Sequence, residues 1–366
     1  MKAARPAATK RPTTLGRDHF LLHLGGWLPL FLSLLLLSCT APEGPAAHSE
    51  ELDIYFVDVE GGQATLIVTP EGESMLVDSG SPGFEGRDME RILQAAQLAG
   101  LEQLDYMLIT HYHEDHVGAV PELAERIPIV TFVDHGPNQE ETERAAELYE
   151  NYRQVRARAR HLLVAPGDEV PLKGAEVTVV SAAGNALSSP LEGAGGENPL
   201  CPSAERKEDD PSENAQSVGF VLEFGRFRFI DLGDLTWNKE LELACPSNLI
   251  GDVDVYLTTH HGLPYSGPPA LVHALRPRVA VMNNGATKGG HPDSWQVVRN
   301  SPQLQDLWQL HYSVAGSQAA NSPSEYLANL EDDHKGSWIK LSARRDGSFT
   351  VTNSRNGFQK EYPAGI

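Results

Sequence analysis

Four side chains of the metal-ligating type fall within six residues of this chain, directly after a predicted strand. The strand is expected over 105–110, and His111, His113, Asp115 and His116 follow it. His111 and His113 alternate along extended chain, so both rings can point to one side. Asp115 and His116 begin the next predicted helix and can point back toward them. Because neutral imidazoles and carboxylates bind Zn²⁺, or the harder Mn²⁺ and Fe²⁺, the run predicts a metal site at a strand end.

The rest of the chain predicts a layered α/β fold in two similar halves. In both halves, strands with alternating or continuous apolar residues end in a polar turn and are followed by helical spacing. The predicted strands are 53–59, 64–68, 74–77, 105–110, 129–133, 217–224, 227–230, 253–259, 279–283, 338–343 and 349–353. Because ligands gather at the carboxyl ends of strands in such sheets, the polar turns are expected at one edge.

Residues 1–38 are expected to be a lipoprotein-type signal peptide. Basic residues precede an apolar run at 24–37, which is shorter than the ~20 residues of a membrane-spanning helix. The small residues before Cys39 resemble the bacterial lipoprotein signal, in which the cysteine is lipidated and becomes the first mature residue. We therefore expect an exported protein, periplasmic or on the bacterial cell surface, with a flexible tether at 39–51 and one folded domain at 52–366. An ordinary signal peptide, cut between residues 39 and 47, is the alternative.

The mature chain is strongly acidic. Removal of residues 1–38 takes away five basic side chains and one acidic one, so the formal net charge moves from −21 to −25. A field of this sign repels phosphate backbones at long range and provides no electrostatic footprint for nucleic acid. We therefore expect no stable binding of nucleic acid.

Two cysteines besides Cys39 remain in the mature chain, Cys201 and Cys245. In an exported protein an even number favours a disulfide, so we predict a bridge between them, with two unpaired cysteines as the alternative. The bridge would tie down a long loop at 184–213, which is rich in Gly, Pro, Ser and acidic residues and has no periodicity.

The run at 110–116 resembles the central motif, Thr-His-x-His-x-Asp-His, of the metallo-β-lactamase superfamily. The resemblance extends over about 53–301, and the blocks at 56–64, 260–262 and 290–292 are similar to those of the hydrolase domain of bacterial competence (DNA-uptake) channel proteins. It implies a four-layer αββα fold and two divalent metal ions, Zn²⁺ in first place and Mn²⁺ or Fe²⁺ as alternatives.

The resemblance also implies a set of metal ligands. They are His111 and His113 for the first metal, Asp115, His116 and His260 for the second, and Asp234 between the two. His260 is preferred to His261 because it comes first after the strand. The family has a third imidazole in the first site where this chain has Asn214. Asn214 as ligand, or His135 as ligand or substrate contact, is expected to take that place; the alternative is that both are ordinary loop residues.

Three further roles are expected around the metals. Asp115 can also hold the attacking water, and His291 can donate a proton to the leaving group, although a plain loop histidine is the alternative there. Asp78 is expected to orient the ligand histidines and not to bind metal itself.

The predicted function is that of a metal-dependent hydrolase which uses a metal-activated water on an ester, a lactone or a phosphodiester. The resemblance to competence proteins makes a nuclease or phosphodiesterase acting on DNA one alternative. A non-catalytic surface module, held together by metal, is another, since fold alone does not specify function. The expected partners are a small-molecule or phosphodiester substrate and, through the lipid on Cys39, the membrane.

Replacing Cys39 with Ser should abolish membrane association of the mature protein, because the lipid is attached through that thiol. Fractionation of producing cells into membrane and soluble protein measures this. An unchanged distribution of the Cys39→Ser variant would contradict the lipoprotein prediction.

Overall fold

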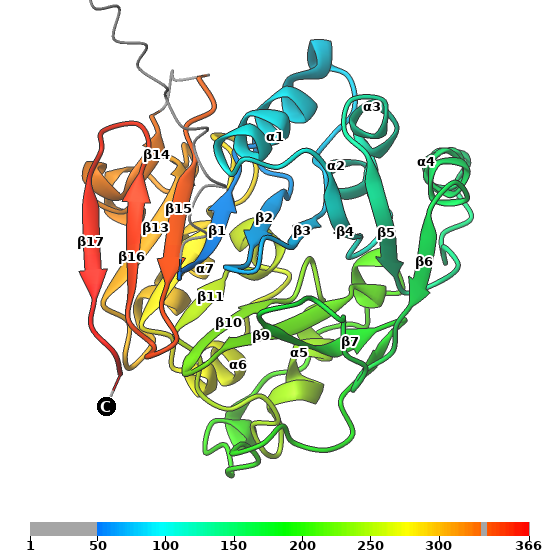
Figure 1. Ribbon diagram of the computed structural model, residues 1–366. Coiled ribbons are helices and arrows are strands. Elements are labelled where there is room, and N and C mark those ends of the chain that lie inside the picture. The colour runs from blue at the N-terminus through cyan, green and yellow to red at the C-terminus, as the bar shows by residue number, and fades with distance from the viewer. Residues whose placement is uncertain (1–49, 331–334, 366) are drawn as a thin grey trace, which may run out of the picture. The chain divides into compact units, whose positions relative to one another are not determined.

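The computed structural model describes residues 50–330 and 335–365 (Figure 1). The signal peptide expected at 1–38, the proposed lipid site Cys39 and nearly all of the tether lie outside the described residues. Within the described part, no helix is both long enough and apolar enough to cross a bilayer.

The first of two sheets in the described part has nine strands. In order across the sheet they are β17 (Gln359–Tyr362), β16 (Phe349–Asn353), β15 (Ile339–Ala343), β1 (Leu52–Phe56), β2 (Thr65–Val68), β3 (Ser74–Val77), β4 (Leu104–Leu108), β5 (Ile129–Asp134) and β6 (Arg160–Leu163). Strands β1 and β2 form the predicted antiparallel hairpin, and β15 and β16 form the predicted hairpin near the end of the chain. Strand β15 pairs with β1, so the last segment of the chain returns to the first sheet.

The second sheet has eight strands in the described part. In order they are β14 (Leu327–Asn329), β13 (Asp306–His311), β12 (Val279–Met282), β11 (Val255–Leu257), β10 (Phe227–Asp231), β9 (Gly219–Phe224), β7 (Glu176–Ala182) and β8 (Asn185–Ala186). Strands β10 to β13 run parallel to one another, and β9 pairs with β10 in antiparallel fashion.

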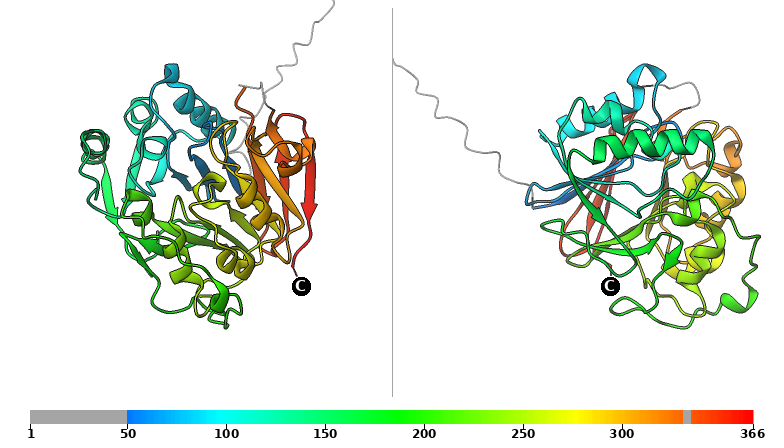
Figure 2. Two further views of the ribbon diagram at one scale, coloured as in Figure 1. Left: turned by 180° about the vertical axis from the view of Figure 1, so that it is seen from behind. Right: turned by 90° about the vertical axis from the view of Figure 1, so that its right-hand side faces the viewer.

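The two sheets pack face to face, and helices cover their outer faces (Figures 1 and 2). One apolar core lies between the sheets, and a separate core lies beneath each helical layer. The helices on the first sheet are α1 (Arg87–Leu98), α2 (Glu114–Val117), α3 (Val120–Ala124) and α4 (Glu143–Arg156), and those on the second are α5 (Trp237–Ala244), α6 (Pro269–Leu275) and α7 (Pro292–Arg299). This is the predicted four-layer αββα fold, which is confirmed.

Strand β1 shows why its sequence is apolar at nearly every position. Ile54 and Phe56 point into the core between the sheets, whereas Tyr55 and Val57 belong to the core beneath the helices. A strand that is covered on both faces reads as a continuous apolar run and not as an alternating one. The same burial on both sides leaves strand ends and loops as the places where polar side chains can gather.

The parallel strands bring the polar turns of both halves to one edge. Strands β3, β4 and β5 are parallel in the first sheet, and β10, β11 and β12 are parallel in the second. The carboxyl ends of parallel strands meet at the same edge, which is where open α/β sheets bind their ligands.

Cys201 and Cys245 form a disulfide, as predicted. Cys245 directly follows α5, and Cys201 begins a short 3-10 turn within the long loop at 184–213. The bridge therefore attaches this loop, which contains little regular structure, to the helical layer of the second sheet.

Candidate metal centre

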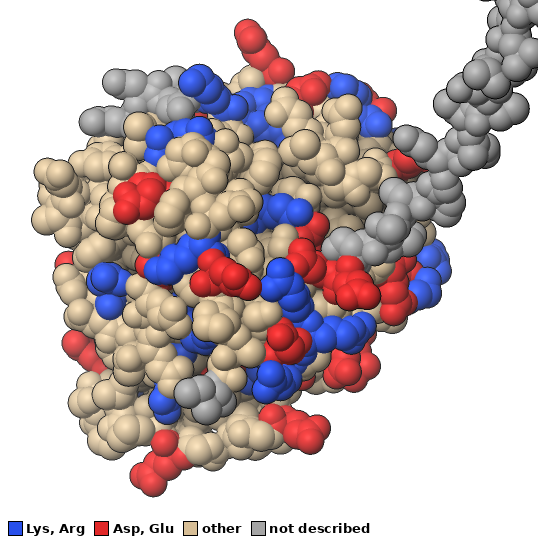
Figure 3. All heavy atoms as spheres, turned by 60° about the vertical axis from the view of Figure 1, so that its left-hand side comes forward, with Lys and Arg blue, Asp and Glu red and all other residues tan. Residues whose placement is uncertain are grey.

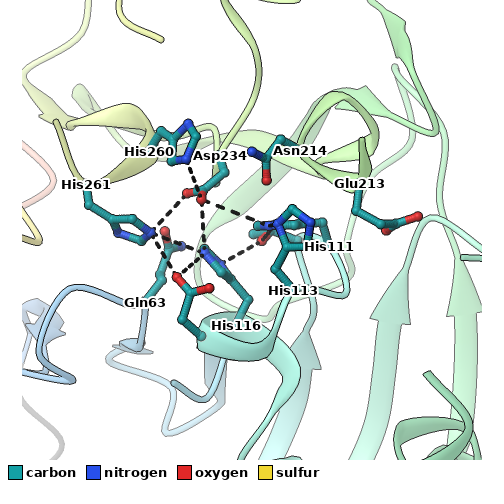
Figure 4. Close-up of polar contacts among 12 residues, drawn as sticks. Gln63, His111, His113, His116, Glu213, Asn214, Asp234, His260 and His261 are labelled. Carbon is teal, nitrogen blue, oxygen red and sulfur yellow. Dashed lines mark hydrogen bonds and ion pairs between the residues drawn. The ribbon is translucent and has the colours of Figure 1, made fainter. Parts of the chain in front are cut away.

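Four potential ligands from both halves of the chain converge on one point (Figure 4). They are Asp115 and His116 on α2, Asp234 in the turn after β10, and His261 in the turn after β11, and their ligand atoms all lie within 4.8 Å of one another. The Nε2 atom of His116 lies 3.2 Å from Asp115 Oδ2 and 3.3 Å from Asp234 Oδ2. The Nε2 atom of His261 lies 3.2 Å from Asp115 Oδ2 and 3.3 Å from Asp234 Oδ1.

The structure corrects the predicted preference for His260 over His261 as a metal ligand. His261 belongs to the four-residue group, whereas His260 Nε2 lies 3.4 Å from Asp234 Oδ2 and is the more exposed of the two rings. Both residues adopt the left-handed backbone conformation, with φ of 55° and 56°. Because two consecutive left-handed residues turn the chain sharply, position after the strand end does not tell which ring reaches the site.

His111 and His113 lie on the other side of Asp234. His111 Nε2 is 3.0 Å from His113 Nδ1 and 4.0 Å from Asp234 Oδ2. Asp234 thus belongs to the four-residue group and also approaches His111, as the sequence expected of a shared ligand. A second ion would be held by these three side chains.

In the view of Figure 4, Asn214 is drawn near Asp234 and His111. Its Oδ1 atom is buried and has no hydrogen-bond partner among the described residues. An unpartnered buried acceptor is costly, and a cation would satisfy it. Since the Nε2 atoms of His116 and His261 also face each other at 3.3 Å beside two carboxylates, the donor set fits divalent metal ions.

Two carboxylates outside the ligand set orient the histidines. Asp78 accepts hydrogen bonds from the backbone and hydroxyl of Thr110, at 2.8 and 2.7 Å, and from His116 Nδ1 at 2.7 Å. His113 Nε2 donates to Glu140 Oε1 at 2.9 Å. These contacts leave His116 Nε2 and His113 Nδ1 facing the centre, as outer partners of metal-binding histidines do. Sequence reasoning had singled out Asp78 but missed Glu140, which lies in a loop without any pattern.

The charges of the group suit metal binding. Burial would raise the pKa values of Asp115 and Asp234, but the adjacent histidines, with His116 common to both, hold those pKa values well below the ordinary range. Both carboxyls are therefore ionised at neutral pH. Burial lowers the pKa of His111, which stays neutral, whereas Asp234, Asp115 and Asp78 outweigh burial and raise the pKa of His116. A metal ion bound by His116 would have to displace its proton.

His135 does not reach the metal centre. Its Nε2 atom lies 3.1 Å from Glu213 Oε2, and its ring packs on Tyr112 with the centroids 4.7 Å apart. Glu213 is buried and also accepts hydrogen bonds from the backbone of Tyr112 and of Gln139. His135 is therefore not among the side chains that gather as potential metal ligands, because a buried carboxylate that sequence patterns do not reveal binds its ring. Its role as a substrate contact stays a prediction.

His291 caps a helix. Its Nδ1 atom accepts a hydrogen bond from the backbone N–H of Asp293 in the first turn of α7, and its side chain is partly exposed. Its backbone N–H bonds to the carbonyl oxygen of Gly262, next to His261. The capping contact explains a histidine at this position, and its role as a proton donor stays a prediction.

Sequence reasoning also missed Lys288 and the close packing of the 60–63 turn. The ammonium of Lys288 forms an ion pair with Asp115 Oδ2. A Cβ atom at Gly62 would lie 2.4 Å from the carbonyl oxygen of Asp115, so only glycine allows this approach. The backbone N–H of Gln63 donates to the same oxygen at 3.1 Å. The turn therefore holds α2 in place from outside the cluster.

Residues 57–196 match the family model described as the metallo-beta-lactamase superfamily. The chain is 33% identical over 104 residues to a hydroxyacylglutathione hydrolase of Stenotrophomonas maltophilia, a stretch that covers 28% of this chain and 37% of that protein. It is 37% identical over 65 residues to a coenzyme F420H(2) oxidase of Methanothermobacter marburgensis, covering 18% of this chain and 16% of that protein. The matched stretches are thus well under half of either relative.

Among solved structures, the chain is similar to Igni18, a metallo hydrolase of the archaeon Ignicoccus hospitalis. The TM-score is 0.41 and the sequence identity 15%, with 70% of this chain and 94% of that one covered. The family match and the four-layer architecture support the metallo-beta-lactamase superfamily, whose relatives above include a hydrolase and an oxidase. The finer resemblance to competence proteins stays a prediction.

A buried carboxyl binds the segment that follows the His260–His261 turn. Glu240 on α5 accepts a hydrogen bond from the backbone N–H of Gly267 at 2.6 Å, while its Oε1 atom has no hydrogen-bond partner in the described part of the chain. Burial raises its pKa from 4.5 to about 8. At neutral pH this side chain is therefore mostly protonated in the folded protein.

Replacing His261 with Ala should weaken metal binding more than replacing His260 with Ala. His261 Nε2 lies within 3.3 Å of both carboxylates, and even the loss of an outer partner typically weakens metal affinity about 10- to 100-fold. Metal content after dialysis, measured by mass spectrometry, should fall by about one ion per chain in His261→Ala only. A greater loss of metal from His260→Ala would instead support His260 as the ligand.

Replacing Glu240 with Gln should change how stability depends on pH. Glu240 titrates near 4.5 when unfolded and at about 8 when folded, so the wild type loses stability as pH rises through that window. The Gln variant lacks this loss, and its stability relative to wild type should increase by a few kcal/mol, to order of magnitude, between about pH 4.5 and 8. Urea unfolding at pH 5, 6.5 and 8 tests it, with Glu242→Gln on the same helix as control. A constant difference across these pH values would refute the pKa shift.

Proposed function

We propose that this chain is a metal-dependent hydrolase of esters, lactones or phosphodiesters. The proposal starts from its metallo-beta-lactamase fold and its match to that superfamily over residues 57–196. One observation carries the proposal: Asp115, His116, Asp234 and His261 converge on one point, and Asp234 continues toward His111 and His113. A structural metal needs only one closed site, whereas this arrangement has ligands for two ions on either side of a shared carboxylate.

The side chains would have different roles in such a centre. Divalent ions held there would lower the pKa of a water molecule and polarise a carbonyl or phosphoryl oxygen. Asp78 keeps His116 turned so that its Nε2 faces the carboxylates, and Glu140 keeps His113 turned so that its Nδ1 faces His111 Nε2. Asn214 supplies an amide oxygen where an imidazole is expected, and an amide is the weaker donor for zinc. We propose Zn²⁺ because imidazole and carboxylate ligands predominate, with the harder Mn²⁺ or Fe²⁺ as the alternatives that the amide oxygen would favour.

The site is open on one side. The side chains of His111, His116 and His261 are fully buried, whereas those of His113 and Asp115 are 31% and 22% exposed. Substrate would therefore approach over His113 and Asp115. Because Asp115 is both ionised and accessible, it is placed to accept a proton from an attacking water.

A nuclease of the competence type is the second candidate, and the blocks at 56–64, 260–262 and 290–292 favour it. Against it, the chain has a formal net charge of −21, and on the face shown in Figure 3 lysine and arginine side chains are interspersed with acidic ones. Proteins that track DNA use a basic stripe to contact its backbone. We therefore place small substrates first.

We further propose that the protein acts outside the cytoplasm, as a lipoprotein anchored through Cys39. The Cys201–Cys245 disulfide supports this place of action, because disulfides persist in oxidising compartments. The apolar run before Cys39 supports export.

The hydrolase proposal is tested with the mature, metal-loaded protein on bis-p-nitrophenyl phosphate, p-nitrophenyl acetate, a lactone, nitrocefin and plasmid DNA. We expect turnover of at least one small substrate and a loss of more than about 100-fold in the Asp115→Ala variant, since general base and ligand are removed together. Cleavage of DNA alone would favour the nuclease. Bound metal without any turnover above that of Asp115→Ala would instead support a metal-stapled binding module.

A further inference from the structure

Lys288 stands at the open side of the metal centre on a loop that is firmly held. The loop joins β12 to α7, and the backbone N–H of Gly285 bonds to the carbonyl oxygen of Lys288 at 2.8 Å, which closes a tight turn. Further backbone bonds run from Gly290 to His261 at 2.9 Å and from Val314 to Ala286 at 3.0 Å. The loop is therefore attached both to the turn that carries His261 and to the segment after β13.

The 60–63 turn packs against the same loop. Gly61 has a φ of 93°, and a Cβ atom there would lie 2.9 Å from Lys288 Cβ and 2.9 Å from the backbone nitrogen of Gly285. Such contacts are shorter than carbon atoms tolerate, so glycine at 61 allows the two loops to touch. The backbone of Lys288 is thus fixed beside the metal centre, and only its side chain remains free to move.

The side chain of Lys288 reaches the ligand atoms from the solvent side. Its ammonium contacts Asp115 Oδ2, the oxygen that lies 3.2 Å from the Nε2 atoms of both His116 and His261. The Lys288 side chain is 39% exposed, more than that of Asp115 at 22%. The ammonium therefore lies between the buried ligands and the solvent, on the side from which substrate approaches.

Metal ions would change the partner of this ammonium. Two divalent ions bring more positive charge than Asp115 and Asp234 neutralise, so they repel a cation held against Asp115 Oδ2. A lysine has a long, flexible stem and can move its ammonium a few ångströms into the opening. There it needs a new anionic partner, and the substrate is the group that enters the opening.

We propose that Lys288 binds a negatively charged group of the substrate next to the scissile bond. This proposal deepens the proposed hydrolase function and rests on it. It narrows the substrate class to esters with an anionic oxygen beside the reacting centre: phosphodiesters, or carboxylic esters and lactones that carry a carboxylate. Neutral esters lack a partner for Lys288 and are poorer substrates.

The test compares Lys288→Met, which keeps the length but removes the charge, with Lys288→Arg, which keeps the charge. Lys173→Met is the matched control, because Lys173 also pairs with a carboxylate, Glu73, near the opposite end of β3 from Asp78. The substrates are p-nitrophenyl acetate, the mono-p-nitrophenyl ester of succinate, and bis-p-nitrophenyl phosphate. The first two share a leaving group and differ in the carboxylate.

We expect Lys288→Met to raise KM for the two anionic substrates by about tenfold or more, the usual effect of losing one charge-assisted hydrogen bond. KM for the neutral acetate ester should stay within about twofold, and Lys288→Arg should recover most of the loss. If KM rises only for the phosphodiester, the charge that Lys288 binds is on the reacting phosphoryl group. If KM rises for the succinate ester too, Lys288 binds a neighbouring carboxylate. Equal loss for neutral and anionic substrates would overturn the proposal.

Two binding measurements separate this proposal from the hydrolase proposal. Calorimetry with inorganic phosphate on the metal-loaded protein should show about tenfold weaker binding to Lys288→Met than to wild type and Lys173→Met. If this holds although wild type hydrolyses nothing, the anion site stands and the hydrolase proposal fails. If phosphate binds Lys288→Met and wild type equally, the anion site is overturned whatever the activity. Loss of metal from Lys288→Met would also overturn it, since Lys288 would then only position Asp115.

Discussion

A single buried carboxylate, Asp234, organises the functional end of this molecule. Four histidine rings surround it: His116 and His261 at 3.3 Å, His260 at 3.4 Å and His111 at 4.0 Å. A carboxylate removed from water is tolerated only where cations or hydrogen-bond donors compensate its charge. The partners come from both sheets, so the two halves of the chain must meet at the correct strand ends for this charge to be buried.

The correct meeting of the two halves depends on packing around the cluster. The apolar residues of strands such as β1, buried on both faces, bring the sheets together face to face. The parallel strands then deliver Asp78, the 110–116 run, Asp234 and His261 to one edge. Asp78 and Glu140 orient two of the rings, and the glycines at 61 and 62 let a neighbouring turn pack against α2 and the Lys288 loop. The chemistry of the site thus depends on packing as much as on the ligands themselves.

The cluster is unevenly exposed to solvent. The rings of His111, His116 and His261 are buried, while the side chains of His113, Asp115 and Lys288 keep some exposure. That opening holds charges of both signs. A metal ion would neutralise the carboxylate of Asp115 and would displace the ammonium of Lys288 from it. A chain with an acidic composition can therefore still present a locally cationic opening, because the local field depends on the few charges that lie closest.

Much of the fold and most residues of the candidate metal centre could be predicted from sequence. The layered α/β architecture, the hairpins at both ends of the domain and the disulfide follow from local apolar patterns and residue types, which act over short stretches. The 110–116 run carries its own geometry, because its spacing already places the side chains on one side. The pairing of β15 with β1 has no local signal, since it joins segments more than 280 residues apart.

Only the tertiary structure decided which long-range partners meet. The choice of His261 over His260 depends on two consecutive left-handed residues, and the capture of His135 depends on Glu213, a carboxylate from a different loop. Glu140 and Lys288 lie in loops whose sequence has no period, so nothing in their neighbourhood predicts a contact with the site. By itself the sequence determined which types of side chain form the candidate metal centre, because ligand type and spacing are local properties. The structure decided the partners, because burial and charge compensation depend on residues that the fold brings together from distant parts of the chain.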